Sequence, residues 1–165
     1  MLTIVNSLVF DKSGRAYPAK VEVEVTNGIG IHVVGIRDNS VKELLLRIVT
    51  AMRRMGYHVP GKKIVINFAS PLPAREMRWV ELLDYPAMLA LITAVSDEGP
   101  GIINDVNYKS YYLGKASLDG LIFPLESEQY YSVLKWKCEF GGDEGKSALI
   151  ICPNSFPTML NVHEH

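Results

Sequence analysis

Residues 41–70 read VKELLLRIVTAMRRMGYHVPGKKIVINFAS and contain two hydrophobic patterns in succession. In the first part, apolar residues recur every three or four positions, which places them on one side of a helix and leaves the cations on the other. Gly56 and the Pro60-Gly61 pair then interrupt the pattern. Residues 64–69 form a short, almost continuous apolar run, which is typical of a central strand covered on both faces.

The helix is expected to start at Asp38-Asn39-Ser40, where Ser40 and Glu43 have the spacing of a capping box. It is expected to end near Met55, because Gly56 readily closes a helix. The order helix, turn, strand indicates an α/β domain rather than an all-α or all-β one.

Upstream, residues 2–10 are apolar and β-branched, and residues 19–26 alternate strictly between apolar and charged side chains, so both predict strands. Asn27-Gly28 is a tight-turn signal followed at once by the apolar run 29–36, and this predicts a hairpin. Gly28 and Gly30 would then lie in a hairpin turn and not between a strand and a helix, so they do not form a dinucleotide-binding loop.

Downstream, residues 84–95 are apolar almost all round and predict a helix within the core. The pattern further predicts a hairpin of 108–117 with 121–123, a helix over 127–137 and a strand over 148–152. The expected architecture is a single domain over residues 1–165. It is a two-layer α/β sandwich with helices packed on one mixed sheet.

Composition narrows the class of protein further. The 165 residues are 48% apolar and 21% charged with a net charge of −1, as in an ordinary globular domain. No apolar run approaches membrane-spanning length, and the N-terminus lacks the features of an export signal, so we expect a cytoplasmic protein without membrane contact. Cys138 and Cys152 lie in apolar runs and are expected to be buried thiols. The histidines are scattered, so no metal and no cofactor is expected.

Two motifs typical of enzymes, a phosphate-binding loop and a nucleophile elbow, are not complete in the sequence. Residues 141–147, GGDEGKS, end in the Gly-Lys-Ser of a phosphate-binding loop, but Phe140 stands where that loop needs its first glycine. A solvated turn is expected there. No Gly-x-Ser-x-Gly elbow occurs, so no serine is assigned as a nucleophile.

Positive charge is concentrated in the first part of the chain. Residues 1–96 hold 12 Lys and Arg against 8 Asp and Glu, whereas residues 97–165 hold 5 against 10. One cluster stands out, and it consists of Arg37, Lys42, Arg47, Arg53, Arg54, Lys62 and Lys63. Such a cluster is either a polyanion-binding surface or the solvated side of an amphipathic helix, and the sequence leaves both open.

Five motifs in order carry a family resemblance: Val34–Glu43, Gly56–Pro71, Asp84–Leu91, Leu113–Gly120 and Ala148–Asn154. Together they resemble the N-terminal Lon-protease-like domain of the magnesium-chelatase subunit ChlI and competence protein ComM family. The resemblance implies a fold like that of ribosomal protein S5 domain 2. In that family an AAA+ ATPase module follows this domain, and we find no such module within this sequence.

The sequence departs from the family pattern at positions that matter for function. Lon-type peptidases carry a nucleophilic serine in the stretch matched by Leu82–Met88, which has no serine here. Their partner lysine is missing from Pro124–Tyr130, so Lys135 or Lys137 would have to replace it. The family's glycine loop has become Arg75–Glu81. A catalytic role is therefore not expected.

These observations lead to two hypotheses. The first is a non-catalytic Lon-like accessory domain that contacts a protein partner, such as an AAA+ ATPase, or another copy of itself. Exposed Arg78 and Trp79 are candidate interface residues, although Trp79 fits a core position equally well. The second hypothesis is a nucleic-acid-binding accessory domain that uses the basic surface of residues 37–63 in DNA processing.

Overall fold

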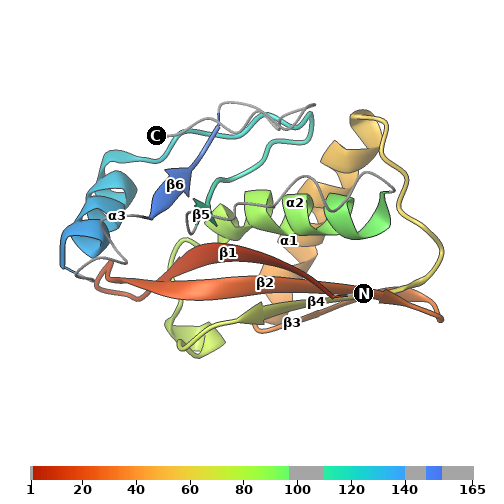
Figure 1. Ribbon diagram of the computed structural model, residues 1–165, viewed down its shortest axis with the longest axis horizontal. Coiled ribbons are helices and arrows are strands. Elements are labelled where there is room, and N and C mark those ends of the chain that lie inside the picture. Colours follow the sequence, from red (N-terminus) through yellow and green to blue (C-terminus); the bar gives the residue numbers. More distant parts are fainter. Residues whose placement is uncertain (1, 97–109, 140–147, 154–165) are drawn as a thin grey trace.

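The computed structural model describes residues 2–96, 110–139 and 148–153. Figure 1 shows a layer of four strands with helices on one side of it, which confirms the predicted α/β class. The elements are β1 (Leu2–Phe10), β2 (Ala16–Thr26), β3 (Gly30–Val34), α1 (Asp38–Arg54), β4 (Lys63–Ala69), η1 (Ala74–Glu76), η2 (Val80–Leu83), α2 (Asp84–Val95), β5 (Ser110–Tyr112), α3 (Ser127–Glu139) and β6 (Leu149–Ile151).

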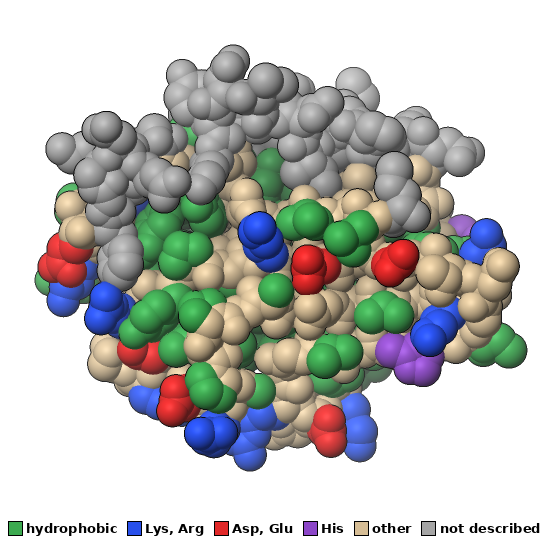
Figure 2. Space-filling model, turned by 60° about the horizontal axis from the view of Figure 1, so that its bottom comes forward, with side chains coloured by type: hydrophobic (Ala, Val, Ile, Leu, Met, Phe, Trp, Pro, Cys, Tyr) green, Lys and Arg blue, Asp and Glu red, His purple; other side chains and the backbone are tan. Residues whose placement is uncertain are grey.

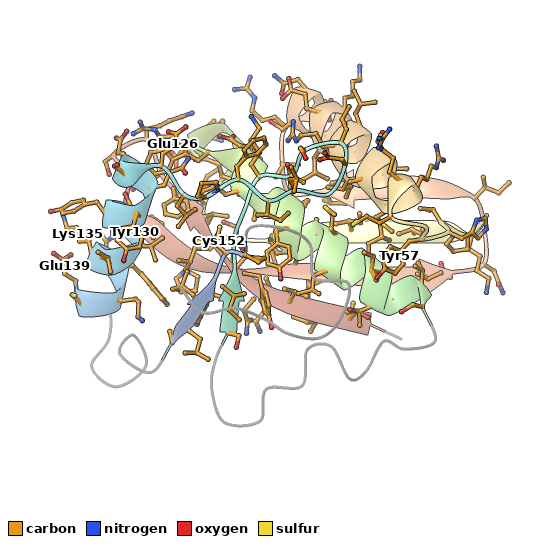
Figure 3. The ribbon with its side chains drawn as sticks, turned by 90° about the horizontal axis from the view of Figure 1, so that it is seen from above. Tyr57, Glu126, Tyr130, Lys135, Glu139 and Cys152 are labelled. Atoms are coloured by element: carbon orange, nitrogen blue, oxygen red, sulfur yellow. The ribbon has the colours of Figure 1, made fainter. Side chains whose placement is uncertain are left out.

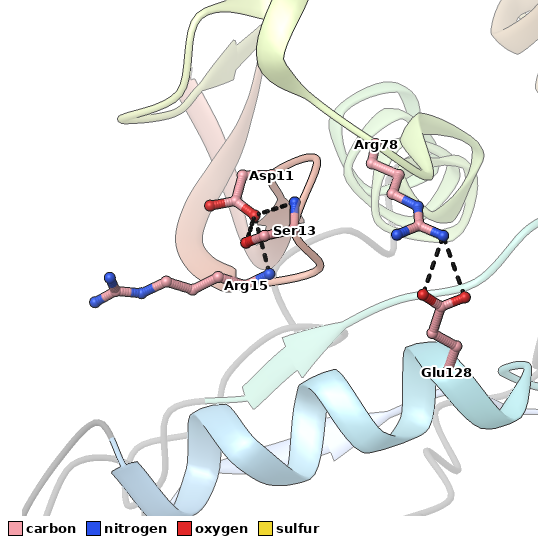
Figure 4. Close-up of polar contacts among 5 residues, drawn as sticks. All are labelled: Asp11, Ser13, Arg15, Arg78 and Glu128. Atoms are coloured by element: carbon pink, nitrogen blue, oxygen red, sulfur yellow. Dashed lines mark hydrogen bonds and ion pairs between the residues drawn. The ribbon is translucent and has the colours of Figure 1, made fainter.

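Strands β1 and β2 form an antiparallel hairpin in which Val5 is opposite Val21. The Asp11 carboxylate organises the turn between them. Its Oδ1 accepts hydrogen bonds from the backbone N–H of Ser13 at 2.9 Å and of Arg15 at 3.0 Å (Figure 4). The hydrogen bond from the Ser13 hydroxyl is the main cause that lowers the pKa of Asp11. This turn fixes the register of the hairpin.

The hairpin expected around Asn27-Gly28 is wrong. Strand β4 lies between β2 and β3, in the order β1-β2-β4-β3, so β2 and β3 do not pair. Strand β4 is antiparallel to β2 and parallel to β3, with Val33 beside Ile66. The α1 crossover permits this arrangement, because a parallel pair needs a long connection and a tight turn cannot provide one.

Strand β4 is central, as predicted, but only one of its faces is covered. Ile64, Ile66 and Phe68 are buried, whereas the alternate side chains are partly exposed. On the open face, Asn67 Nδ2 donates to Glu22 Oε1 at 2.8 Å. The expectation of cover on both faces fails because an apolar run cannot distinguish a buried face from a half-solvated one.

Helix α1 starts within the predicted segment Asp38-Asn39-Ser40, but without the predicted cap. Its first residue is Asp38, Arg37 is the extended residue before it, and no side chain caps the start. The predicted capping box of Ser40 and Glu43 is therefore wrong. The predicted end is correct within one residue, because the helix ends at Arg54 and Gly56 has φ +92°.

Helix α2 lies in the core, as its sequence predicts. Its residues from Asp84 to Ile92 are all buried, and it packs against β1, β2 and α1. Because α1 and α2 bury their side chains against the same sheet face, one hydrophobic core forms between the two layers.

A second, smaller unit adjoins β1. Strands β5 and β6 pair in parallel, and the Ser7 hydroxyl donates to the Tyr112 backbone oxygen at 2.8 Å, which links the two sheets. Trp136 of α3 packs edge-on against Tyr111 at 5.0 Å between ring centroids. Within the described residues, the hairpin expected for 108–123 is reduced to one bridge, Ala116 with Ile122.

Helix α3 extends two residues past its predicted end, and β6 covers three of the five residues of the predicted final strand. The predicted turn at 141–147 lies outside the described residues. Within the described parts of the chain, no helix combines the length and the apolar character needed to cross a membrane.

Candidate functional site

The cations of the predicted basic surface are spread over a long stretch of the molecule. Arg37, Lys42, Arg53, Arg54, Lys62 and Lys63 are all exposed. However, Arg37 precedes the first residue of α1 and Arg53 is in its last turn, so a helix of 17 residues, about 25 Å long, separates them. Exposed Asp38 and Glu43 lie among these cations on α1, and on the face displayed in Figure 2 the Lys and Arg side chains are intermixed with Asp and Glu side chains. Binding to a polyanion would favour cations grouped without such acidic neighbours.

Arg47 is not part of that surface. Its Nε lies 2.7 Å from Asp84 Oδ2 and its Nη2 lies 3.1 Å from Asp84 Oδ1, so the guanidinium is engaged by both carboxylate oxygens. The Arg47 side chain is 20% exposed and the Asp84 side chain is fully buried. Arg47 therefore neutralises a core carboxylate within the domain, and its contact with a partner or nucleic acid stays a prediction.

Arg54 is also influenced by an anion. Asp119 lies in the turn that packs against the end of α1, where Gly120 approaches Met55, and the positive charge of Arg54 contributes to lowering the pKa of Asp119. The main cause of that lowered pKa is the hydrogen bond from Ser117. The acidic second part of the chain thus provides a neighbour for one of the two arginines at the end of α1.

The start of α2 is a closely packed polar centre. Asp84 accepts from Arg47 and from the Ala116 backbone N–H at 3.0 Å. The backbone oxygen of Gly114 accepts a hydrogen bond from the Tyr85 N–H, and the Gly114 N–H donates one to the backbone oxygen of Leu82. Burial raises the pKa of Asp84 to about 6, and the hydrogen bond and charge of Arg47 act in the opposite direction. This centre joins α1, α2 and the 114–116 segment.

The segment 78–79 is anchored rather than free. Trp79 is partly buried and has φ +54°, and its ring contacts Phe10 edge-on at 5.3 Å between centroids. Arg78 lies over the Trp79 ring at 4.2 Å and pairs with Glu128 of α3 at 3.1 Å (Figure 4). Of the two roles expected for Trp79, the packing favours the core role.

An apolar groove opens between α3 and β6, and we call it the α3 groove. It has a volume of about 180 Å³ and is lined by Pro124, Leu125, Tyr130, Val133, Leu134, Lys137, Ile150 and Cys152. Figure 3 shows α3 beside β6, with Tyr130 on the helix and Cys152 just past the strand. Among the described residues that line the groove, Lys137 alone is charged.

The cysteines differ in exposure. Cys152 is buried in the wall of the α3 groove, and burial raises the pKa of its thiol to about 11. Cys138 is exposed, so the expectation that both thiols are buried is wrong for Cys138. Because Cys152 remains a protonated thiol at neutral pH, it contributes apolar surface to the groove and little nucleophilicity.

A second hollow of about 530 Å³ lies on the other side of α3, against the β1–β2 turn. Lys135 and Glu139 line it, and Figure 3 places both away from Cys152. Its lining combines apolar surface with polar side chains and carries charges of both signs. Among the described residues, no group of three or more His, Cys, Asp and Glu side chains is placed to hold a metal ion.

Sequence reasoning missed the α3 groove. Tyr130, Val133, Leu134 and Lys137 are spaced i, i+3, i+4, i+7, which places them on one side of a helix. That spacing was the available signal. It was weak, because a second set on the same helix, including Val133 and Trp136, is buried against β5, and the two sets overlap.

The fold and these sites define an α/β domain with two helices on one face of a mixed sheet and a buried ion pair between the helices. The sequence model of the family "Subunit ChlI of Mg-chelatase" matches residues 21–134. The chain belongs to this family, which confirms the resemblance.

Two curated relatives extend the comparison. The uncharacterized protein YifB of Salmonella typhimurium is 34% identical over 111 residues, which cover 66% of this chain and 20% of the relative. The uncharacterized protein YifB of Escherichia coli K12 is 38% identical over 82 residues, which cover 48% of this chain and 15% of the relative. The chain thus matches about a fifth or less of the length of these relatives.

Proposed function

We propose that this chain is a non-catalytic, Lon-like accessory domain of a ChlI-family protein and that it acts by docking another protein. The expected partner class is an AAA+ ATPase, as the family resemblance implies, and a second copy of the chain is the alternative. The α3 groove is the observation that carries this proposal. Exposed apolar hollows on a folded domain commonly mark contact sites for other molecules.

The exposed side chains around the groove support a protein partner. At the groove, Tyr130 is 48% exposed and Leu134 is 41% exposed, and the neighbouring Tyr131, which lines the second hollow of the same helix, is 67% exposed. Aromatic residues are enriched at protein interfaces, because they bury a large area at a small cost in conformational entropy. No comparable cluster of exposed aromatic residues accompanies the cations of α1 in the described chain.

The chemistry at the start of α2 supports a non-catalytic role. By the family resemblance, a Lon-type nucleophile would lie at this position, and the chain has the carboxylate of Asp84 there, held by Arg47 and the Ala116 N–H. A carboxylate held by these donors in the core has no access to a substrate. Covalent hydrolysis requires an accessible nucleophile beside a base.

The test is affinity capture with purified chain as bait, from a lysate of the cell that carries the gene, after nuclease treatment and at low and high salt. Three baits are compared: wild type, Tyr130→Ala with Leu134→Glu, and Lys42→Gln with Lys62→Gln and Lys63→Gln. We expect a protein that wild type and the lysine variant retain at high salt and that the groove variant loses.

Two outcomes would contradict the proposal. Without nuclease treatment, recovery of nucleic acid that falls with salt and is lost only in the lysine variant would favour the basic surface of residues 37–63. Peptidase turnover by the purified chain that disappears on substitution of one serine would show that the domain is catalytic.

A further inference from the structure

The α3 groove has the size of one side chain. Its volume is about 180 Å³. An engineered apolar cavity of about 150 Å³ in another protein binds benzene, so this groove has room for one aromatic ring or one large branched aliphatic group. The space is too small for a helix face and is open on one side, so the occupant must present a single protruding side chain.

The walls of the groove select an apolar occupant. Leu125, Val133 and Ile150 contribute hydrocarbon surface, and Cys152 adds a buried thiol that donates to the Phe123 backbone oxygen at 3.6 Å. Burial of apolar area in such a site is favourable in proportion to the area removed from water. A charged or amide side chain would lose its hydration there without gaining enough partners.

The positive charge in the lining indicates which group of the bound segment lies next to its apolar side chain. Lys137 is partly buried and lines the groove one helical turn after Val133. No described acidic side chain lies within salt-bridge distance of it. An ammonium group at the edge of an apolar site favours a carboxylate next to the apolar group.

We propose that the α3 groove binds a protein segment in which a large apolar side chain stands next to an acidic residue. The apolar side chain occupies the space between α3 and β6, and the acidic residue pairs with Lys137. This inference rests on the proposed function, because it specifies the chemistry of the docked partner.

The test uses four-residue peptides and the purified full chain labelled with ¹⁵N. The probes are acetyl-Gly-Phe-Asp-Gly-amide, its Asn counterpart and its Ala-Asp counterpart, each titrated to millimolar concentration while amide shifts are recorded. We expect Phe-Asp to shift the signals of groove residues, Ala-Asp to leave them unchanged, and Phe-Asn to bind about threefold more weakly, as expected for a partly exposed ion pair.

Two variants isolate the lysine. Lys137→Gln is expected to bind the Phe-Asp and Phe-Asn peptides with equal affinity, because the acidic residue then has no cation to pair with. Lys135→Gln removes the same charge from the same helix on the side away from Cys152, so it is expected to leave the difference intact. Both positions have side chains in contact with solvent, and overlaid amide spectra verify that each variant is folded.

Three results would overturn the inference: no shift of groove signals by Phe-Asp, equal effects of the two lysine substitutions, or equal binding of Phe-Asp and Ala-Asp. If the peptides fail while capture of a protein still depends on Tyr130 and Leu134, the docking function holds and only the specificity is wrong. If Phe-Asp binds while no protein is captured, the specificity of the groove holds and the proposed docking function is overturned.

Discussion

The Nε of Arg47 lies 2.7 Å from Oδ2 of Asp84, and this contact joins the solvent side of α1 to the buried start of α2. The two residues are 37 positions apart in sequence. Because the Asp84 side chain is fully buried, its ionised carboxylate needs the Arg47 guanidinium beside it, so the pair matters most above pH 6, where Asp84 is ionised.

Removal of one member of the pair should destabilise the domain strongly. Arg47→Met leaves a buried carboxylate without its cation, and the expected loss is about 3 to 5 kcal/mol in the free energy of unfolding. Lys42→Met, on the same helix but exposed, should change it by less than about 0.5 kcal/mol. The measurement is urea denaturation followed by circular dichroism. Equal effects of the two substitutions would show that the pair contributes nothing.

The double variant Arg47→Met with Asp84→Leu gives a further test of the same pair. It removes both charges together, so it should be less destabilised than the sum of the single variants predicts. The Ala116 N–H then loses its acceptor, which costs about 1 to 3 kcal/mol and prevents full recovery. Additive single effects would contradict the coupling.

The stability of the domain should depend on pH through Asp84. Its pKa is raised from 3.8 to about 6 in the fold. The folded state therefore keeps a proton that the unfolded chain releases near pH 3.8, so this carboxyl stabilises the fold most below that pH and the effect is lost as pH rises through 6. Relative to Asp84→Asn, wild type should lose about 2 kcal/mol between pH 4 and pH 7. Denaturation of both proteins at several pH values measures this, and a constant difference would disprove it.

Gly35 should tolerate no side chain. It has φ +100°, and a Cβ there would collide with the backbone oxygen of Phe68 in β4. Gly35→Ala should therefore lower the free energy of unfolding by more than about 1 kcal/mol, because it adds a steric clash to left-handed strain. Gly61→Ala is the control, since no atom lies within 4 Å of its Cβ position. The melting temperatures of both variants test this prediction, and similar values would count against the clash at Gly35.

The two cysteines should react at different rates. Cys138 is exposed, whereas Cys152 is buried with a thiol pKa of about 11. At pH 8 a thiol reagent such as iodoacetamide should modify Cys138 and leave Cys152 unmodified until the chain is unfolded. Peptide mass spectrometry after timed labelling measures this. Equal rates in the native protein would show that the groove wall opens.

The helices follow from the sequence because helical periodicity is a local property. The apolar spacing of α1 and the continuous apolar run of α2 each identify the helix, and the predicted bounds of α2 agree with Asp84–Val95. The start of α1 is less determined, since the chain begins the helix at Asp38 without the predicted side-chain cap. Cap residues indicate a preference that neighbouring packing can override.

Strand pairing could not be read in the same way. The Asn27-Gly28 signal is real as a turn, but it does not determine which strand lies beside β3. Strand β4 is about 30 positions further along the chain, and it reaches that place because α1 packs its apolar side on the sheet. A local sequence pattern cannot identify the neighbouring strand when a crossover helix connects the two strands.

The sequence by itself determined the α/β class, the helical segments and the family, because each depends on residue types at short spacing. The tertiary structure alone decided the roles of the charges and the existence of the α3 groove. Both Arg47 and Lys42 are cations in the same helical pattern. Arg47 pairs with a core carboxylate and Lys42 stays exposed, because the tertiary structure places Asp84 beside Arg47. The groove forms where α3 and β6 meet, and contacts between segments distant in sequence depend on how the whole chain packs.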